Sequence, residues 1–252
     1  VPLAAREHRI EIVERVGADG DVLTPLDEAG LEAAVETLKA AGVDAVAVCF
    51  LHSYRRPDHE KIARAALERL MPDAYISLSS EVLPEFREYE RLSTTVLNAF
   101  IGPRMQAYLD RFLARVSDLG ITVEPYTIHS NGGLMSVRTV RETPVRTCLS
   151  GPAAGVVGAT EVAKAADFPN IVTFDVGGTS TDVSLVHGSR PLFASTRSIA
   201  DYPIKTPMID IHVIGAGGGS IAWMDDAGAL KVGPHSAGAE PGPAAYGRGG
   251  NE

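Results

Sequence analysis

The sequence predicts an α/β fold, with a mainly parallel sheet in its first half and a strand-rich second half. Apolar runs typical of strands alternate with amphipathic helical segments up to about residue 80, which is the pattern of βαβ units. Glycine is unevenly distributed, because 6 of the 25 glycines precede residue 121 and 19 follow it. We therefore expect the tight turns and ligand loops in the second half.

The first strand and helix are expected between residues 10 and 42. Residues 10–16 form a β-type run, and Thr24 is placed to cap the following helix, with Pro25 at its first position. Gly42 follows that helix as its C-terminal cap. The apolar stripe that would face the core consists of Leu31, Val35 and Leu38.

A βαβ unit is expected next. Residues 43–51 form an apolar run, as in a strand covered on both faces, and residues 75–78 form the next strand. Pro57 opens the helix between them. The apolar positions of this helix are Ile62, Ala66 and Leu70.

A long helical region is expected over residues 84–119, with an interruption near Gly102 and Pro103. A dense charge cluster lies at its start and consists of Arg87, Glu88, Glu90 and Arg91. Ion pairs three and four residues apart on a solvated face explain this cluster better than catalysis does.

The second half begins with a strand over residues 123–128 that runs into a glycine turn at 129–133. His129 could be an acid, a base or a ligand, but a structural role is favoured for a single histidine at a strand end. Ser150 is then placed to cap a helix with Pro152 in its first turn. The small residues of this helix would allow close packing against another backbone.

The most informative segment is a predicted β-hairpin over residues 173–186, whose form suits a polyphosphate. Gly177 and Gly178 lie in its turn, and because they lack side chains their backbone N–H groups can close on phosphate oxygens. Thr179 and Thr181 add hydroxyl donors. An ordinary Gly-Gly hairpin turn is the alternative, but such a turn does not require these polar neighbours.

Two carboxylates frame this turn. Asp175 and Asp182 would repel phosphate directly, so we predict that they hold Mg²⁺, in part through water, and form the catalytic pair. The spacing Asp-x-Gly-Gly-Thr-x-Thr-Asp differs from the Walker loop Gly-x4-Gly-Lys-Ser/Thr, because no Lys follows and a strand rather than a helix is expected next.

A second glycine-rich loop follows an expected strand over residues 209–214. No helix is expected after it, which argues against a dinucleotide-binding fold. The positions predicted to approach the nucleotide are Gly217, Gly218 and Gly219. Asp210 and His212 would share one face of the incoming strand, as further metal ligands, as a proton-transfer pair or as a structural pair.

Two later segments complete the chain. Residues 225–228 are typical of a hairpin turn, whereas residues 232–243 predict a Pro/Gly loop that lies against the protein. The sequence leaves the roles of His235 and Glu240 in that loop open.

Composition excludes several classes of protein. The net charge of −9 argues against a partner that is nucleic acid or an acidic membrane. No apolar run approaches the roughly 18 residues that span a bilayer, so a cytoplasmic protein is expected. Cys49 and Cys148 do not make a disulfide framework. Cys49 is expected to be a buried small hydrophobe, and Cys148 is a weak candidate for a nucleophile because no His is near it in sequence.

Six segments together resemble the hydantoinase A / 5-oxoprolinase family in their order and spacing. They are EVLPEFREYER at 81–91, SNGGLM at 130–135, LSGPAAGVVGA at 149–159, DVGGTSTDVS at 175–184, IGAGGGSIA at 214–222 and VGPHSAGAEPGPAAYGRGG at 232–250.

This resemblance implies an actin-like, sugar-kinase-like ATPase with ribonuclease H-like lobes, in which mixed sheets are flanked by helices. Residues 1–149 would be the remainder of the first lobe, and residues 150–252 the connecting helix and the start of the second. The hairpin at 173–186 would be the second of two phosphate-binding hairpins, the first of which this chain lacks. The family usually has Cys where Ala245 stands, which weakens a thiol role there.

The resemblance also implies a reaction. Family members include ATP-dependent N-methylhydantoinases, 5-oxoprolinases and ATP-using subunits of acetone- and acetophenone-carboxylase-type enzymes. We expect an ATP-dependent cyclic amidase that uses Mg²⁺, Mn²⁺ or K⁺ and works with a hydantoinase B-type subunit or domain. A carboxylase subunit and a non-enzymatic actin-like nucleotide switch are the alternatives, and a sugar kinase is disfavoured.

The ends of the chain predict an internal fragment of a longer protein. There is no initiator Met, and the sequence stops within a glycine-rich loop. We expect little or no catalysis from the fragment alone, because half of a phosphate clamp cannot exclude water.

Overall fold

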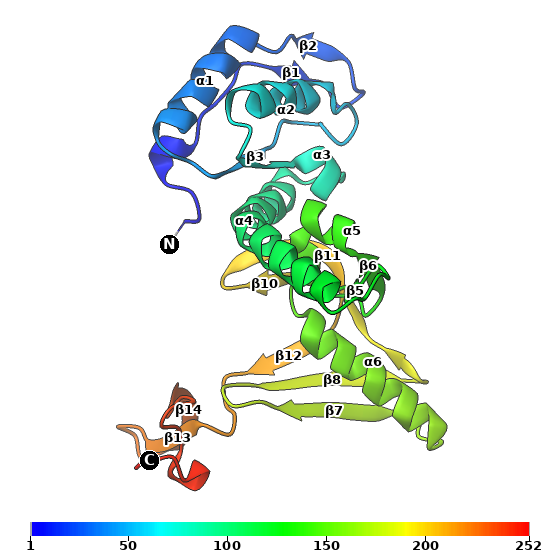
Figure 1. Cartoon of the computed structure of the whole chain (residues 1–252), viewed down its shortest axis with the longest axis vertical. Helices are drawn as coiled ribbons and strands as arrows, with labels where there is room; N and C mark the ends of the chain where they lie inside the picture. Colours follow the sequence, from blue (N-terminus) through cyan, green and yellow to red (C-terminus); the bar gives the residue numbers. More distant parts are fainter. Residues whose placement is uncertain (1, 252) are drawn as a thin grey trace. The chain divides into compact units, whose positions relative to one another are not determined.

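The computed structural model describes residues 2–251 and has a mixed α/β architecture (Figure 1). It consists of two compact units built from interleaved segments. The first unit holds the residues up to 127 together with 134–148 and 195–206. The second holds 128–133, 149–194 and the residues from 207 onward.

The first unit contains most of the helices. Its elements are η1 Arg6–His8, β1 Arg15–Val16, β2 Val22–Thr24, α1 Glu28–Ala40, β3 Ala45–Val48, α2 Asp58–Leu70, β4 Tyr75–Leu78, α3 Ser79–Val82, α4 Glu88–Asp118, β6 Leu134–Ser136, α5 Val137–Glu142 and η2 Pro144–Thr147. Three further strands contribute to both units, namely β5 Tyr126–Ile128, β10 Phe193–Ile199 and β11 Tyr202–Ile209.

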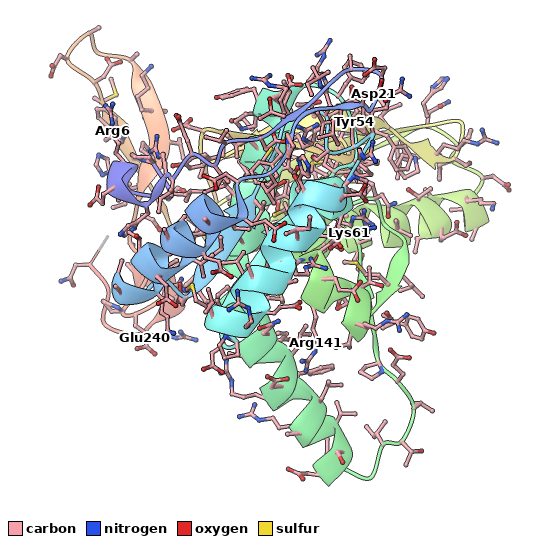
Figure 2. The ribbon with its side chains drawn as sticks, turned by 90° about the horizontal axis from the view of Figure 1, so that it is seen from above. Arg6, Asp21, Tyr54, Lys61, Arg141 and Glu240 are labelled. Carbon is pink, nitrogen blue, oxygen red and sulfur yellow. The ribbon has the colours of Figure 1, made fainter. Side chains whose placement is uncertain are left out.

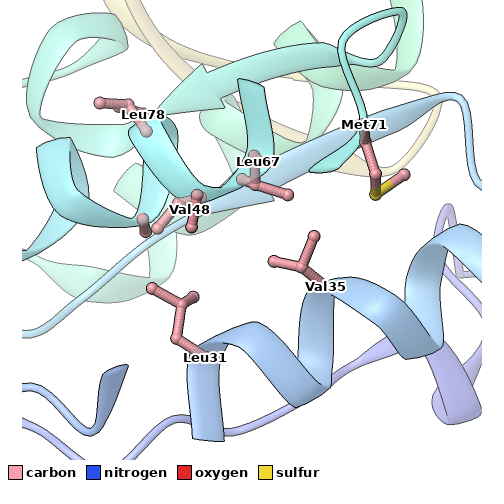
Figure 3. Close-up of a cluster of buried hydrophobic side chains, with 8 residues drawn as sticks. Leu31, Val35, Val48, Leu67, Met71 and Leu78 are labelled. Atoms are coloured by element: carbon pink, nitrogen blue, oxygen red, sulfur yellow. The ribbon is translucent and has the colours of Figure 1, made fainter. Parts of the chain in front are cut away.

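The predicted βαβ unit is confirmed. β3 and β4 pair in parallel, and α2 connects them. The core beside them is aliphatic, and its labelled members in Figure 3 are Leu31, Val35, Val48, Leu67, Met71 and Leu78. Burying each such side chain contributes about 1.5–3 kcal/mol relative to leaving it exposed, so this cluster is a main source of stability for the unit.

The start of the first helix was predicted wrongly. Thr24 ends β2, and the Asp27 carboxylate caps α1 by accepting a hydrogen bond from the Gly30 N–H at 3.0 Å. An aspartate at this position also interacts favourably with the helix dipole, which explains why Asp27 prevails over Thr24. Gly42 follows the helix with φ +70°, as predicted.

The buried face of α2 also differs from the prediction, since Ile62 is 38% exposed. The residues that α2 buries are His59, Glu60, Ala63, Ala66 and Leu67. Glu60 is fully buried and accepts hydrogen bonds from the Phe50 N–H, the Ser79 hydroxyl and the Ser80 N–H at 3.0, 2.6 and 2.8 Å. This polar network sets the rotation of the helix, and an apolar-pattern argument could not anticipate it.

α4 runs without a break through Pro103, contrary to the predicted interruption. Gly102 is the residue that permits its close packing. A Cβ at Gly102 would lie 2.3 Å from the ring of Tyr75, so only glycine lets the helix rest against β4. The Tyr75 hydroxyl then donates to the Arg141 carbonyl at 2.7 Å.

One residue of the charge cluster that was predicted to lie on a solvated face is buried instead. Arg91 is fully buried, and its guanidinium donates to the Phe50 and Glu85 carbonyls at 2.7 and 3.1 Å. It also lies 5.4 Å from the centre of the Tyr54 ring, and Tyr54 is labelled in Figure 2. Arg91 therefore joins two loops rather than facing solvent.

The second unit is built around an antiparallel sheet. Its elements are α6 Ser150–Ala165, β7 Ile171–Val176, β8 Thr181–His187, β9 Arg190–Pro191, β12 Ile211–Ile214, β13 Ser220–Met224, β14 Leu230–Ser236 and η3 Ala244–Tyr246. The strand order is β12-β8-β7, with β9 paired to β8, and β13 and β14 form a separate hairpin. That hairpin turns at residues 225–228, as predicted. β14 occupies the start of the segment predicted as a loop over 232–243.

The cap predicted for α6 was wrong. The residue before the helix is Leu149, in the left-handed region at φ +59°, and no side chain caps the helix. Ser150 is instead the first helical residue.

The two faces of the sheet differ. α6 runs along the sheet (Figure 1) and covers one face. The core of that face consists of Ala153, Val156, Val186, Ile209 and Ile211. The other face, which we call the open face, exposes five large apolar side chains by between 40% (Ile214) and 68% (Phe174). Its members are Val172, Phe174, Val176, Leu185 and Ile214.

Candidate functional site

The predicted hairpin is present. β7 and β8 pair antiparallel from Ile171↔Val186 to Val176↔Thr181, and residues 177–180 form the turn. The Gly177 N–H donates to the Ser180 carbonyl at 2.9 Å and closes this turn. The sequence folds in this way because β-rich runs flank two residues without side chains.

The second glycine-rich loop stacks directly on the hairpin turn. The Gly218 N–H donates to the Gly177 carbonyl at 2.9 Å, and the Gly219 N–H donates to the Gly178 carbonyl at 2.7 Å. A Cβ at Gly217 would lie 2.6 Å from the Gly177 carbonyl oxygen, so this contact requires glycine. The structure thus brings together the two glycine segments that the sequence proposed for one ligand.

Consecutive backbone donors at this stacked turn are free. Among residues 2–251 the N–H groups of Gly178 and Thr179 have no hydrogen-bond acceptor, and both residues are exposed. Consecutive free N–H groups in a turn form a concave donor site for an anion. Thr179 also exposes its hydroxyl here. The Thr181 hydroxyl is instead buried and donates to the Ala216 carbonyl at 2.6 Å, where it joins the two segments.

Asp175 and Asp182 lie opposite each other on neighbouring strands, so they share one face of the sheet. That face is the one covered by α6, and a Cβ at Gly155 would lie 3.9 Å from the Asp175 Oδ2 atom. Two like charges directly opposite each other destabilise an antiparallel pair. Carboxylate oxygens are the ligands that Mg²⁺ prefers, so this pair fits a divalent cation that would relieve the repulsion.

His212 and Asp210 are not brought to this pair. His212 lies opposite Val183, and therefore on the open face, away from Asp182 and Asp175. Asp210 precedes β12, and its N–H donates to the Leu192 carbonyl at 2.8 Å. Within the described part of the chain, no three His, Cys, Asp or Glu side chains gather as a metal site. A cation at the hairpin would therefore depend on two carboxylates, water and the ligand.

His129 is held by its own turn. Its Nδ1 atom accepts a hydrogen bond from the Asn131 N–H at 3.0 Å, which places a proton on Nε2 in the neutral ring. Gly132 has φ +82°, and a Cβ there would lie 2.6 Å from Cγ2 of Val157. The turn therefore packs tightly on α6 in the second unit.

The remaining undecided residues have ordinary surroundings. His235 lies on β14 and meets the Trp223 ring edge-on at 5.9 Å. Glu240 is exposed. Burial raises the pKa of the Cys148 thiol, which makes it a poor nucleophile. No helix among residues 2–251 is both long enough and apolar enough to cross a membrane.

Sequence reasoning missed Tyr246. Its hydroxyl lies 3.6 Å from the position of a Cβ on Gly218, so it borders the stacked turn. The only signal was its place in the run Pro-Ala-Ala-Tyr-Gly-Arg-Gly-Gly at 243–250.

The chain is similar to known proteins. A family model described as "Hydantoinase/oxoprolinase" matches residues 91–252, and one described as "Hydantoinase/oxoprolinase N-terminal region" matches residues 1–71. The chain is 42% identical to the caprolactamase subunit alpha of Pseudomonas jessenii, over 99% of this chain and 36% of the relative. It is 38% identical to the 5-oxoprolinase of Saccharomyces cerevisiae, over 91% of this chain and 18% of the relative.

Two solved structures are similar. The ATP-dependent caprolactamase from Pseudomonas jessenii superposes with a TM-score of 0.82 at 43% identity, over 95% of this chain and 35% of that chain. Nucleotide-free acetone carboxylase superposes with a TM-score of 0.80 at 29% identity, over 94% of this chain and 34% of that chain. These likenesses confirm the predicted fold class. The chain spans about a third or less of the length of these relatives. Because the first family model covers most of the chain, this protein belongs to the hydantoinase/oxoprolinase family.

Proposed function

We propose that the stacked glycine turns form part of an ATP site in a protein that opens a cyclic amide ring at the expense of ATP. The observation that carries this proposal is the pair of free N–H groups at Gly178 and Thr179, beside a carboxylate pair. These are the parts that a polyphosphate with a divalent cation needs.

Each residue type has a distinct part in this proposal. The Gly178 and Thr179 N–H groups and the Thr179 hydroxyl bind phosphate oxygens, and Gly217, Gly218 and Gly219 keep the loop close to the turn. Asp175 and Asp182 hold Mg²⁺, or Mn²⁺ in its place, directly or through water.

ATP, when bound, supplies a phosphoryl group that turns an amide oxygen into a better leaving group. The contribution of this chain is to position the polyphosphate and to neutralise its charge. K⁺ could assist in that neutralisation.

The names of the relatives support a cyclic amide substrate. Caprolactam and 5-oxoproline are both lactams, and one relative is called a subunit alpha, which supports a partner subunit. We propose that this partner is of the hydantoinase B type and that the protein works in the cytoplasm. We also propose that residues 150–252 begin the second ATPase lobe and that residues 1–149 belong to the first. This chain alone would then bind phosphate weakly and turn over little ATP.

A second candidate is a subunit of a ketone carboxylase, which the likeness to acetone carboxylase favours. An actin-like nucleotide switch would use the same hairpin without chemistry. Substrate-dependent ATP hydrolysis by the full-length protein separates the three. A lactam or hydantoin should stimulate it in the first case, a ketone with bicarbonate in the second, and neither in the third.

The residue-level test is Asp175→Ala in the full-length protein. We expect ATP turnover to be abolished with the circular dichroism spectrum unchanged. Asp226→Ala is the matched control, because Asp226 is an exposed aspartate in the β13–β14 turn. Turnover at the wild-type rate in the Asp175 variant would reject the site.

A further inference from the structure

The proposed phosphate site needs a cation from the protein, and few are available. Four Lys or Arg side chains belong to the second unit, namely Lys164, Arg190, Lys231 and Arg248. A polyphosphate carries several negative charges, and Asp175 and Asp182 add two more. The free N–H groups bring only partial charges, so one of these four side chains is the obvious candidate to balance the ligand.

Three of the four are poorly placed. Lys164 lies in the last turn of α6, nine residues and roughly 13 Å beyond the Gly155 position that borders Asp175. Arg190 pairs with His187 at the far end of β8, about 20 Å from the turn at the usual rise of a strand. Lys231 pairs with Asp225 at 3.6 Å in the β13–β14 hairpin.

Arg248 belongs to a loop that is tied to the stacked turn. We call residues 237–250 the C-terminal loop. It begins with the Ala237 N–H donating to the Gly219 carbonyl at 2.8 Å. A Cβ at Gly219 would lie 3.5 Å from the Gly238 carbonyl oxygen, so the start of this loop packs against the glycine segment.

Tyr246 connects Arg248 to the stacked glycine turn. Its hydroxyl borders Gly218, whose own N–H is bonded to Gly177 in the hairpin turn. The Arg248 guanidinium stacks 5.9 Å from the centre of the Tyr246 ring and donates to the Ala239 carbonyl at 3.4 Å. These two contacts occupy one guanidinium nitrogen, which leaves other donors of Arg248 exposed to solvent.

We propose that Tyr246 and Arg248 form the cationic side of the phosphate site, where the Tyr246 hydroxyl and the Arg248 guanidinium bind the polyphosphate held at Gly178 and Thr179. This inference rests on the proposed function, and it assigns the C-terminal loop as a ligand-binding element. The stack on Tyr246 orients the planar guanidinium, which suits paired contacts to phosphate oxygens.

The test is a titration of the ¹⁵N-labelled 252-residue chain with Mg²⁺-pyrophosphate, followed by amide chemical shifts. NMR detects weak binding, so the low affinity expected of this chain does not prevent the measurement. We expect the largest shifts at Gly178, Thr179 and Gly218. Arg248→Gln should weaken the affinity roughly tenfold, because it removes a charge-assisted contact. Tyr246→Phe should weaken it roughly threefold, through loss of one neutral hydrogen bond.

Two variants control this experiment. Arg190→Gln makes the same change of charge in the same unit, far from the turn, and should leave the affinity unchanged. Arg248→Lys keeps the positive charge, so its affinity for Mg²⁺-pyrophosphate should lie within about threefold of wild type. This variant separates the loss of charge from a structural perturbation of the loop by Arg248→Gln. Equal affinities for the two Gln variants would overturn the inference and leave the proposed function standing. Absence of shifts at Gly178 and Thr179 in the wild-type chain would overturn both.

Discussion

Replacing Asp182 with Asn should make the metal-free protein more stable and the Mg²⁺-bound protein less stable than wild type. Asp182 lies directly opposite Asp175, with Cβ atoms about 4.5–5.5 Å apart in such a pair. Asparagine keeps the shape of the side chain and removes one of the two charges. The expected sign of the effect therefore depends on whether a cation is present.

The magnitude follows from Coulomb's law. Two unit charges about 6 Å apart in water repel by about 0.7 kcal/mol, and physiological salt, with a Debye length of about 8 Å, reduces this to roughly 0.3 kcal/mol. Asp175 is exposed, so a high effective dielectric constant is appropriate. Asp182→Asn should raise the free energy of unfolding by about that amount in EDTA, or the melting temperature by about 1 °C.

Mg²⁺ should reverse the order of stability, so that wild type becomes more stable than Asp182→Asn. For a dissociation constant of about 1 mM, Mg²⁺ at about 10 mM stabilises the wild-type fold by about 1.4 kcal/mol. The variant retains one carboxylate and should gain much less. The assay is urea unfolding followed by circular dichroism, with EDTA and with Mg²⁺, for wild type, Asp182→Asn and the exposed-turn control Asp226→Asn.

Two results would refute this reasoning. One is an Asp182→Asn protein that is less stable than wild type in EDTA, which would mean that the carboxylate makes a favourable contact. The other is an equal response of both proteins to Mg²⁺, which would remove the carboxylate pair as a cation site. The control variant should behave like wild type in both buffers.

Three further outcomes are expected. Gly217→Ala should cost about 1–3 kcal/mol of unfolding free energy, because its Cβ would meet the Gly177 carbonyl at 2.6 Å; an unchanged urea midpoint would contradict this. Burial raises the pKa of Tyr75 to about 12, so its neutral form stabilises the fold below pH 10, and that contribution is lost as pH rises from 10 to 12. Tyr75→Phe should therefore show a flatter decline in alkaline urea titrations, and equal slopes would count against it. Burial also raises the pKa of the Cys148 thiol, so in a Cys49→Ser background iodoacetamide should label native protein at pH 8 at least about tenfold more slowly than urea-unfolded protein. Equal rates would show that the thiol is accessible.

The hairpin could be predicted from the sequence because the pattern that defines it is local. Two glycines between β-rich runs define the turn at 177–180 without help from distant residues, and the same holds for the strand at 75–78. The stacking of Gly217, Gly218 and Gly219 on that turn was expected only as a shared ligand site, yet the structure makes it a direct backbone contact.

The predictions from sequence were wrong where contacts with residues far away in the sequence determine which side chains are buried. Arg91 was expected in solvent, but the Phe50 carbonyl, 41 residues earlier, takes one of its donors. Glu60 rotated α2 away from its apolar stripe for the same reason. Thr24 was a reasonable cap by residue type, and Asp27 prevailed because a carboxylate stabilises a helix start more strongly. Tyr246 gave no periodic signal, since it ends η3, a single turn of three residues.

The open face of the second unit's sheet has a practical consequence for handling this chain. Among the residues described, β7 pairs only with β8, so its outer edge presents unpaired backbone groups beside exposed Val172, Phe174 and Val176. An edge strand of this kind is a template for association with a second strand. Samples of the 252-residue chain should therefore oligomerise with rising concentration, and a charged residue in place of Phe174 is the change expected to keep them monodisperse.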